Sequence, residues 1–404
     1  MTTPRVLVVT NDFPPTLGGI QTYVRDYLAA LSPQDAHVVV FASTQDAEAA
    51  RQYDSTLEYT VVRWPRSVML PTPATARRMQ ELIREHRIDT VWFGAAAPLA
   101  LMAGRARAAG ATRIIASTHG HEVGWSMFPG SRQVLGRIGR HVHCLTYVSH
   151  YARNRMSAAF GSTVAWEPMP GGVDTETFHP DPQMRDILRR RYDIENKKVI
   201  VAVSRVVPRK GQDTLVEAMP HIVRHEPNAH LLIVGPGEYA STLRRRASSL
   251  GVGSNVTVTG AVDYEELPGH YCAGDVFALP VRTQGGGLSV EGLGIVFLEA
   301  QACGVPTVAG MGGGAPETVV DGETGLVVNG RDTHAVAATV LSVLSDATLA
   351  ARLAERGRAR VEAAWTWQRL RSQLLAVLAG DGRVPPEAAW SVPIKPINTK
   401  GSSS

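Results

Sequence analysis

Short apolar segments rich in β-branched residues alternate with longer segments of helical periodicity along nearly the whole chain. The apolar segments are continuous rather than alternating, which is typical of strands buried on both faces of a parallel sheet. The pattern predicts an α/β fold with two doubly wound parallel sheets. Two series of strands are expected, at 6–10, 38–42, 60–64, 90–93, 114–117 and 145–149, and at 199–203, 230–235, 255–260, 276–280, 307–309 and 325–328.

A segment dense in proline and glycine, Pro-Met-Pro-Gly-Gly-Val-Asp at 168–174, separates the two series. Such a segment is a turn-rich connector. We predict a first domain at 1–170, a second at 171–365, and a helix at about 366–380 that crosses back to the first domain. Residues 381–404 are expected to be a tail, part of which resembles a cloning remnant. Ligands of open parallel sheets bind at the carboxyl ends of the strands, so the cleft between the domains is the expected site.

Charge and composition limit the classes of protein. The 404 residues carry a net charge of +4, but residues 1–172 hold 17 Arg, no Lys and 12 acidic residues, an excess of five positive charges. Either an anionic partner or an Arg-favouring genome explains this excess. The apolar uncharged segment 91–104 is shorter than the roughly 20 residues of a membrane helix. Three scattered cysteines form neither a disulfide framework nor a metal motif, so we expect a cytoplasmic protein.

Two motifs follow strands of the first domain. Gly18 and Gly19 stand directly before a predicted helix, where free backbone N–H groups bind anions; an ordinary turn is the alternative. The second motif, Ser-Thr-His-Gly-His-Glu at 117–122, places His119 at the carboxyl end of a strand. There His119 contacts a sugar or handles a proton. A metal site formed by His119, His121 and Glu122 and a purely structural histidine are the alternatives.

Two motifs follow strands of the second domain. Arg205 and Lys210 come after its first strand, where two cations suit a diphosphate leaving group; a solvated basic loop is the alternative. Glu291 and Glu299 stand eight positions apart across a glycine-rich turn that opens a helix. The backbone N–H groups of residues 294–297 can receive a phosphate at the helix N-terminus. The carboxylates then contact sugar and ribose, or they act as the acid and base of a glycosidase.

Together these motifs resemble the retaining GT-B glycosyltransferases of family GT4. Glycines 18 and 19, His119, the R-x4-K pair and the E-x7-E pair occur in the order of that family, and the connector at 170–174 and Trp-Thr-Trp at 365–367 are similar to it. The resemblance covers residues 5–380. It implies the GT-B fold, in which two Rossmann-like domains face each other across a cleft.

Four segments, 11–15, 91–100, 117–126 and 207–215, are similar to actinobacterial mannosyltransferases of this family. The resemblance implies transfer of mannose from GDP-mannose to the inositol 6-position of phosphatidylinositol monomannoside. The product would be the α-1,6-linked dimannoside, a precursor of lipomannan and lipoarabinomannan. The alternatives are another nucleotide sugar or a soluble acceptor on the same fold, or a GT-B epimerase or nucleotide-sugar binder.

The resemblance also implies roles for individual residues. Catalysis would use His119 at the mannose 6-hydroxyl, Glu291 at other mannose hydroxyls, and Arg205 and Lys210 at the diphosphate. Glu299 would bind the ribose. The remaining donor contacts implied are Gly18 and Gly19 at the diphosphate, Gly294, Ile295 and Val296 at sugar and phosphate, and Val262 and Asp263 near the guanine.

The acceptor side rests on weaker patterns. Asn11, Asp12 and Arg153 are predicted contacts of the inositol phosphate. Arginines and apolar residues alternate over 132–142, which predicts a basic amphipathic helix on an anionic membrane; a helix whose apolar face is core is the alternative. We expect a peripheral protein on the inner face of the plasma membrane with no nucleic-acid partner. The chain has no Asp-x-Asp motif, and cations can replace Mg²⁺ at the diphosphate, so no essential metal is expected.

Overall fold

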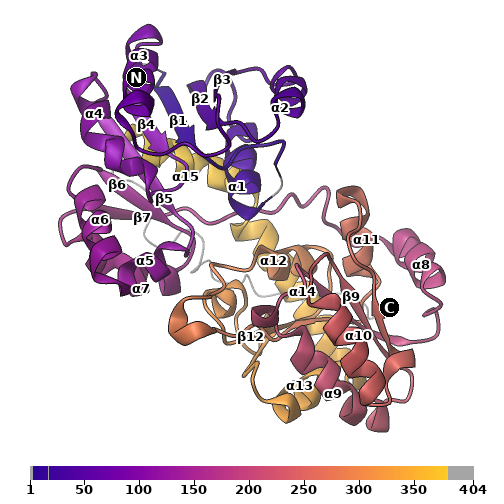
Figure 1. Cartoon of the computed structure of the whole chain (residues 1–404). Helices are drawn as coiled ribbons and strands as arrows, with labels where there is room; N and C mark the ends of the chain where they lie inside the picture. Colours follow the sequence, from indigo (N-terminus) through magenta and orange to yellow (C-terminus); the bar gives the residue numbers. More distant parts are fainter. Residues whose placement is uncertain (1–2, 17, 381–404) are drawn as a thin grey trace, which may run out of the picture.

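The computed structural model describes residues 3–16 and 18–380, which form two lobes (Figure 1). The elements of the first lobe, in chain order, are β1 (Arg5–Thr10), α1 (Gly19–Ala29), β2 (His37–Ser43), α2 (Ala47–Asp54), β3 (Thr60–Trp64), α3 (Pro73–Glu85), β4 (Thr90–Phe93), η1 (Leu99–Met102), α4 (Ala103–Ala108), β5 (Arg113–Thr118), α5 (Glu122–Met127), α6 (Pro129–Gly139), β6 (Cys144–Tyr147), α7 (His150–Phe160) and β7 (Ala165–Pro168).

The second lobe continues the same alternation, and the last helix returns to the first lobe. Its elements are α8 (Pro182–Arg191), β8 (Lys198–Val203), η2 (Pro208–Lys210), α9 (Gln212–His225), β9 (Ala229–Val234), α10 (Ala240–Ser249), η3 (Gly253–Asn255), β10 (Val256–Val258), η4 (Tyr264–Glu266), α11 (Leu267–Cys272), β11 (Val276–Leu279), η5 (Gly285–Gly287), α12 (Ile295–Ala302), β12 (Thr307–Gly310), η6 (Ala315–Thr318), β13 (Leu326–Val328), α13 (Thr333–Ser345), α14 (Ala347–Ala364) and α15 (Trp367–Ala379).

Both sheets are parallel, and each has one point where the strand order reverses. The first sheet has the order β3-β2-β1-β4-β5-β6-β7 and the second has the order β10-β9-β8-β11-β12-β13. Because all strands of a sheet point the same way, the loops that follow them gather at one edge, and ligands bind where the order reverses. The predicted α/β fold with two doubly wound sheets is confirmed. The strand expected at 255–260 is shorter because Gly260 adopts a φ of +81° and pairs with Gly235 as an isolated bridge.

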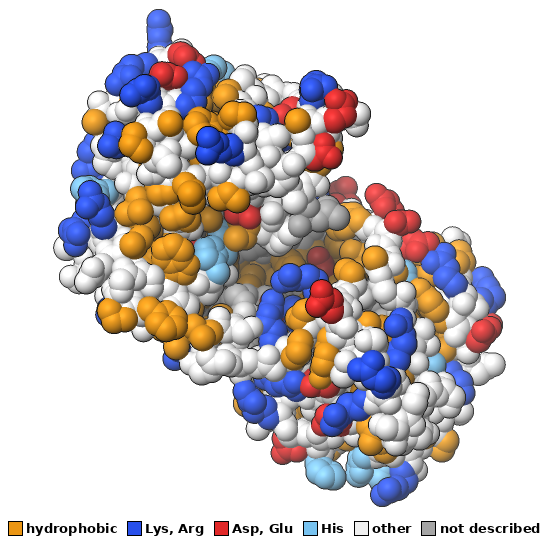
Figure 2. Space-filling model, in the orientation of Figure 1, with side chains coloured by type: hydrophobic (Ala, Val, Ile, Leu, Met, Phe, Trp, Pro, Cys, Tyr) orange, Lys and Arg blue, Asp and Glu red, His pale blue; other side chains and the backbone are white. Residues whose placement is uncertain are grey.

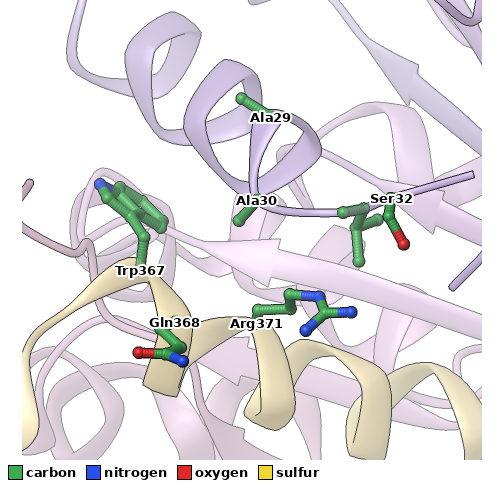
Figure 3. A pocket seen from close by; sticks show the side chains of 7 residues that line it. Ala29, Ala30, Ser32, Trp367, Gln368 and Arg371 are labelled. Atoms are coloured by element: carbon green, nitrogen blue, oxygen red, sulfur yellow. The ribbon is translucent and has the colours of Figure 1, made fainter.

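The C-terminal helix α15 packs against α1 of the first lobe (Figure 3). The Trp367 ring meets the Tyr27 ring edge to face at 5.1 Å, and Arg371 forms an ion pair of 2.6 Å with Asp35. Trp367 and Arg371 also line a small surface pocket between the end of α1 and the start of α15. The tail predicted at 381–404 lies outside the described residues.

The basic helix predicted at 132–142 is α6, and its apolar face belongs to the core. Leu135 and Ile138 are completely buried in the first lobe, whereas Arg132 and Arg137 are exposed. The apolar face is therefore unavailable to a membrane, as in the second of the two interpretations above. Within 3–16 and 18–380, no single helix has the length and hydropathy to cross a bilayer; α13 and α14 meet these criteria only as a pair bent by 95°.

Candidate active site

A buried carboxylate paired with two cations lies on the second lobe beside the cleft. Arg209 and Lys210 belong to η2, at the carboxyl end of β8, and Glu291 precedes α12. The Glu291 carboxylate accepts from Arg209 Nη1 at 2.7 Å and from Lys210 Nζ at 2.8 Å. Burial alone would raise the pKa of Glu291, but Lys210 and Arg209 outweigh it and hold that pKa below its ordinary value. The cluster therefore combines a fixed anion with two cations. Figure 2 shows Lys and Arg side chains at the hollow between the two lobes.

Arg205 belongs to the same loop after β8, five positions before Lys210. Its side chain is exposed and lines a pocket of about 550 Å³ together with Val206, Pro236 and Tyr239. The predicted base contacts, Val262 and Asp263, follow β10, two strands away from β8 in the same sheet. All of these loops lie at the carboxyl edge of the second sheet, where nucleotides bind in open parallel sheets.

The N-terminus of α12 carries backbone donors without a side-chain cap. Gly294 is the N-cap residue and adopts a φ of +93°. A larger residue does not fit there, because its Cβ atom would lie 2.7 Å from the Phe297 ring. The N–H groups of Ile295 and Val296 begin the helix and have no partner within it. A helix N-terminus of this kind attracts an anion.

Glu299 lies on α12, one turn after these donors. Its carboxylate accepts a hydrogen bond of 2.5 Å from the hydroxyl of the buried Tyr271. Burial raises the pKa of Glu299 to about 7, although Tyr271 and Lys210 act in the opposite direction. Glu299 thus exchanges its proton near neutral pH, which suits a group that accepts hydrogen bonds from a ligand once ionised.

The pKa of Glu299 predicts a pH dependence of folding stability. Its folded-state pKa of about 7 lies above the ordinary 4.5, so its contribution to stability is complete below pH 4.5 and is lost as pH rises through 7. The shift corresponds to about 3 kcal/mol. Between pH 4.5 and 8 the ionisation of Glu299 should therefore lower the free energy of unfolding of the wild type by about 3 kcal/mol. Glu299→Gln cannot ionise at this position, so we expect this decrease to be absent from the variant when urea titrations at the two pH values are compared. Equal losses in the variant and the wild type would contradict this assignment.

His119 lies on the first lobe directly after β5. Its Nε2 lies 2.7 Å from the carbonyl oxygen of Gly94, which can only accept, so Nε2 carries the proton and Nδ1 is left as an acceptor. The ring packs edge to face on Tyr23 at 4.7 Å, and the backbone N–H donates to Glu122. Desolvation lowers the pKa of His119 despite the nearby Glu122 charge. A neutral imidazole with a free acceptor suits contact with a hydroxyl.

Three further polar groups surround His119. Glu122 is completely buried, and one of its oxygens lies 3.3 Å from His121 Nε2. Burial raises the pKa of Asp12, with His121 opposing and Glu122 reinforcing the shift. In the described part of the chain no three His, Cys, Asp or Glu side chains converge in a way that could hold a metal ion. The metal interpretation of residues 119–122 is therefore not supported.

The other predicted first-lobe residues have different environments. The Asn11 amide is used within the protein, because it donates to Met69 O at 2.9 Å and accepts from Met69 N at 2.6 Å. Arg153 stands over the Tyr147 ring, and its Nε is buried without a hydrogen-bond partner among the described residues. Gly18 is the N-cap of α1 without a side-chain cap, and a Cβ atom at Gly19 would contact nothing within 4 Å. The backbone at Gly19 is thus open to a ligand, whereas the Gln21 side chain lies against Gly18.

Matches to known proteins extend along both lobes. A family model described as Glycosyltransferase Family 4 matches residues 17–177, and one described as Glycosyl transferases group 1 matches residues 184–360. A Corynebacterium glutamicum protein named GDP-mannose-dependent monoacylated alpha-(1-6)-phosphatidylinositol monomannoside mannosyltransferase is 54% identical over 94% of this chain and 99% of its own length. The chain belongs to glycosyltransferase family 4.

Further relatives of this family 4 glycosyltransferase agree in name and in fold. A Mycobacterium tuberculosis protein named GDP-mannose-dependent alpha-(1-6)-phosphatidylinositol monomannoside mannosyltransferase is 52% identical over 93% of this chain and 98% of its own length. Among solved structures, Anabaena Alr3699/HepE in complex with UDP superposes with a TM-score of 0.79 at 19% identity, covering 93% of this chain and 100% of that one. Likeness at this identity supports the GT-B fold alone.

Two residues of the candidate site in this family 4 protein were not predicted from the sequence. Arg209 pairs with Glu291, which the sequence analysis did not predict, and the only signal for Arg209 was its position next to Lys210. Tyr271 reaches Glu299 from α11, 28 positions earlier in the chain, and nothing in its local pattern marks it. Because α11 and α12 pack together only in the folded lobe, this contact becomes visible in the structure alone.

Proposed function

We propose that this protein transfers mannose from GDP-mannose to the inositol 6-position of phosphatidylinositol monomannoside, forming the α-1,6-linked dimannoside used for lipomannan and lipoarabinomannan synthesis. The observation that carries the proposal is identity of 50–54% to relatives with this named activity over 98–99% of their length. The paired Glu291, Lys210 and Arg209 in the cleft support it, since they can hold a sugar diphosphate.

In this proposal the second domain, 171–365, binds the donor. Lys210 and Arg205 neutralise the diphosphate, and the N–H groups of residues 294–296 hold the phosphate and sugar. Glu291 accepts from mannose hydroxyls, and Glu299 accepts from the ribose. Val262 and Asp263 lie beside the guanine, and Gly18 and Gly19 of the first domain close over the diphosphate. No metal takes part, because cations and helix donors replace it.

The reaction proceeds with retention by attack on one face of the mannose. The bond from C1 to the diphosphate oxygen breaks while the bond from C1 to inositol O6 forms, and the O6 proton passes to the departing phosphate oxygen. The protein contributes positioning and charge stabilisation. This route fits the state of Glu291, whose two ion pairs make it a poor nucleophile, and that of Glu299, which Tyr271 already engages.

The first domain, 1–170 with the helix at 366–380, binds the acceptor. Arg153 has a buried Nε without a partner in the described part of the chain, which suits the inositol phosphate. Asp12 lies with His121 near His119 and can contact the inositol hydroxyls. Asn11 acts through the loop at Met69 that its amide holds.

A transfer assay tests the proposal. Labelled GDP-mannose is supplied with phosphatidylinositol, its monomannoside or no lipid, with UDP-glucose as the donor control and EDTA in a parallel series. We expect product only with GDP-mannose and the monomannoside, α-1,6-linked by NMR and unaffected by EDTA. Product from another donor, or with a soluble acceptor, would mean that the enzyme has this fold but acts on other substrates than those proposed. An altered free sugar without acceptor would identify an epimerase.

A lipid acceptor requires contact with the inner leaflet of the plasma membrane, and three exposed apolar side chains supply a surface for it. Val68 and Leu70 follow β3 at the carboxyl edge of the first sheet, Phe128 joins α5 to α6 in the same lobe, and each is more than half exposed. The exposed Arg66 and Arg132 flank these positions in the sequence. Apolar side chains beside arginines bind an anionic bilayer reversibly.

Phe128→Ser tests this surface. Serine is a favourable N-cap residue, and Phe128 is the N-cap of α6, so the variant should fold. We expect its partition onto anionic phospholipid vesicles at low salt to fall about tenfold in a co-sedimentation assay, because the exposed ring no longer inserts. Ile187→Ser on α8 of the second lobe, also an exposed apolar side chain, is the matched control. Equal sedimentation of Phe128→Ser and this control would reject the surface.

A further inference from the structure

The N-terminus of α7 is completed by a carboxylate from the other lobe. Ser149 is the N-cap residue, and its Oγ accepts from Ala152 N at 3.2 Å. The preceding N–H groups, those of His150 and Tyr151, donate to the two oxygens of Glu317 at 2.8 and 2.7 Å. Glu317 belongs to η6 of the second lobe, so the pair of hydrogen bonds spans the cleft. A carboxylate at a helix N-terminus also interacts favourably with the helix dipole.

Glu317 is tied to the donor side of the cleft. Gly314, at the start of η6, donates its N–H to the carbonyl oxygen of Glu291 at 2.9 Å. Thr318, the next residue after Glu317, accepts at its carbonyl oxygen from Gln301 on α12 at 3.0 Å and from Arg360 on α14 at 2.8 Å. The segment that reaches α7 is thus bonded to the Glu291 loop and to α12, which carry part of the proposed donor contacts.

The backbones of the two lobes meet closely beside this contact. Ser149 Oγ donates to the carbonyl oxygen of Gly292 at 2.6 Å. A Cβ atom at Gly292 would lie 2.6 Å from the carbonyl oxygen of His119, and its next nearest atoms also belong to the first lobe. Gly292 lacks a positive φ, so an alanine there is acceptable within the second lobe alone. Only the observed arrangement of the lobes requires glycine at 292.

We propose that Glu317 is a positioning residue that holds the lobes closed by capping α7 across the cleft. Its two hydrogen bonds bring the loop of Glu291 against the loop of His119, which are the two faces between which transfer would occur. The importance of this closure for catalysis rests on the proposed function, whereas the closure itself does not. Glu317 touches backbone amides, and it acts through the loops that it brings together.

Small-angle X-ray scattering of the whole protein with saturating GDP tests the closure. We expect Glu317→Ala and Gly292→Ala to have a larger radius of gyration than the wild type, the first by losing the cap and the second by steric exclusion. Glu317→Gln, which keeps one good acceptor, should lie between Glu317→Ala and the wild type. In the transfer assay Glu317→Ala should lower kcat about tenfold, the size of a lost helix cap, with partial rescue by Gln.

Glu323→Ala is the matched control, because Glu323 is half exposed and pairs at 3.7 Å only within its own lobe, with Arg356. It should scatter and react as the wild type does. If Gly292→Ala opens the lobes while Glu317→Ala stays as compact as the wild type, the role of Glu317 is overturned. Scattering needs neither sugar nor lipid, so a failed transfer reaction with intact closure would count against the proposed function alone.

Discussion

Replacing Lys210 by alanine is expected to lower kcat/KM for mannose transfer by about 10³-fold. The ammonium group is buried at the carboxyl end of β8, where it would meet the charge that develops on the departing diphosphate. Its loss would also leave the Glu291 carboxylate with Arg209 as its remaining cation, and an incompletely compensated buried charge is costly. Both effects act at the same place, so the expected loss is the largest of any single substitution considered.

Steady-state kinetics with GDP-mannose and the monomannoside measure this loss. Lys198→Ala is the matched control, since Lys198 is exposed and begins the same strand at its opposite end. We expect that control to react at the wild-type rate. A Lys210→Ala enzyme that retained a tenth of the wild-type kcat/KM would exclude a role for Lys210 in stabilising the leaving group.

His119→Ala is expected to lower kcat by about 10²-fold. The ring is fixed by its bond to the Gly94 carbonyl and by the Tyr23 ring, so in the proposed reaction Nδ1 would meet a sugar hydroxyl without a cost in side-chain entropy. Because the pKa of His119 is lowered, the imidazole stays neutral at pH 7, and the wild-type rate should not fall between pH 8 and 7 through protonation of this ring. The rate of each protein across this range gives the comparison.

His37→Ala controls for the loss of a histidine from the same sheet. His37 is exposed at the start of β2, on the amino edge and thus opposite to the cleft. It should leave kcat unchanged. A His119→Ala enzyme with wild-type kcat but reduced thermal stability would mean that His119 packs the first lobe and does not contact the sugar.

Much of the architecture follows from local patterns. Buried parallel strands need continuous apolar residues, and helices need a 3.6-residue period, so the two sheets are evident in the sequence. The carboxyl edge then follows from the alternation itself, and with it the approximate location of His119, Lys210 and Glu291. These residues stand within a few positions of strand or helix ends, and such local placement is what periodicity predicts well.

Contacts between segments that are distant in the sequence could not be predicted from local patterns. The arginine spacing predicted Arg205 at the diphosphate, but it did not predict the pairing of Arg209 with Glu291, which depends on how the short 3₁₀ turn at 208–210 orients its side chains. The apolar stripe of α6 has the same pattern whether it faces a membrane or a core, and only the packing of Leu135 and Ile138 distinguishes them. The Asn11 amide is likewise engaged by Met69, 58 positions later.

The sequence by itself therefore determined the two doubly wound sheets, the edge on which the candidate site lies and the residue types proposed to bind a sugar diphosphate. Only the tertiary structure decided which cation holds Glu291, that Tyr271 meets Glu299, and that Glu317 caps α7 across the cleft. The physical reason is range: periodicity and turn residues act over a few positions. A hydrogen bond between lobes depends on how whole domains pack, and no short segment encodes that.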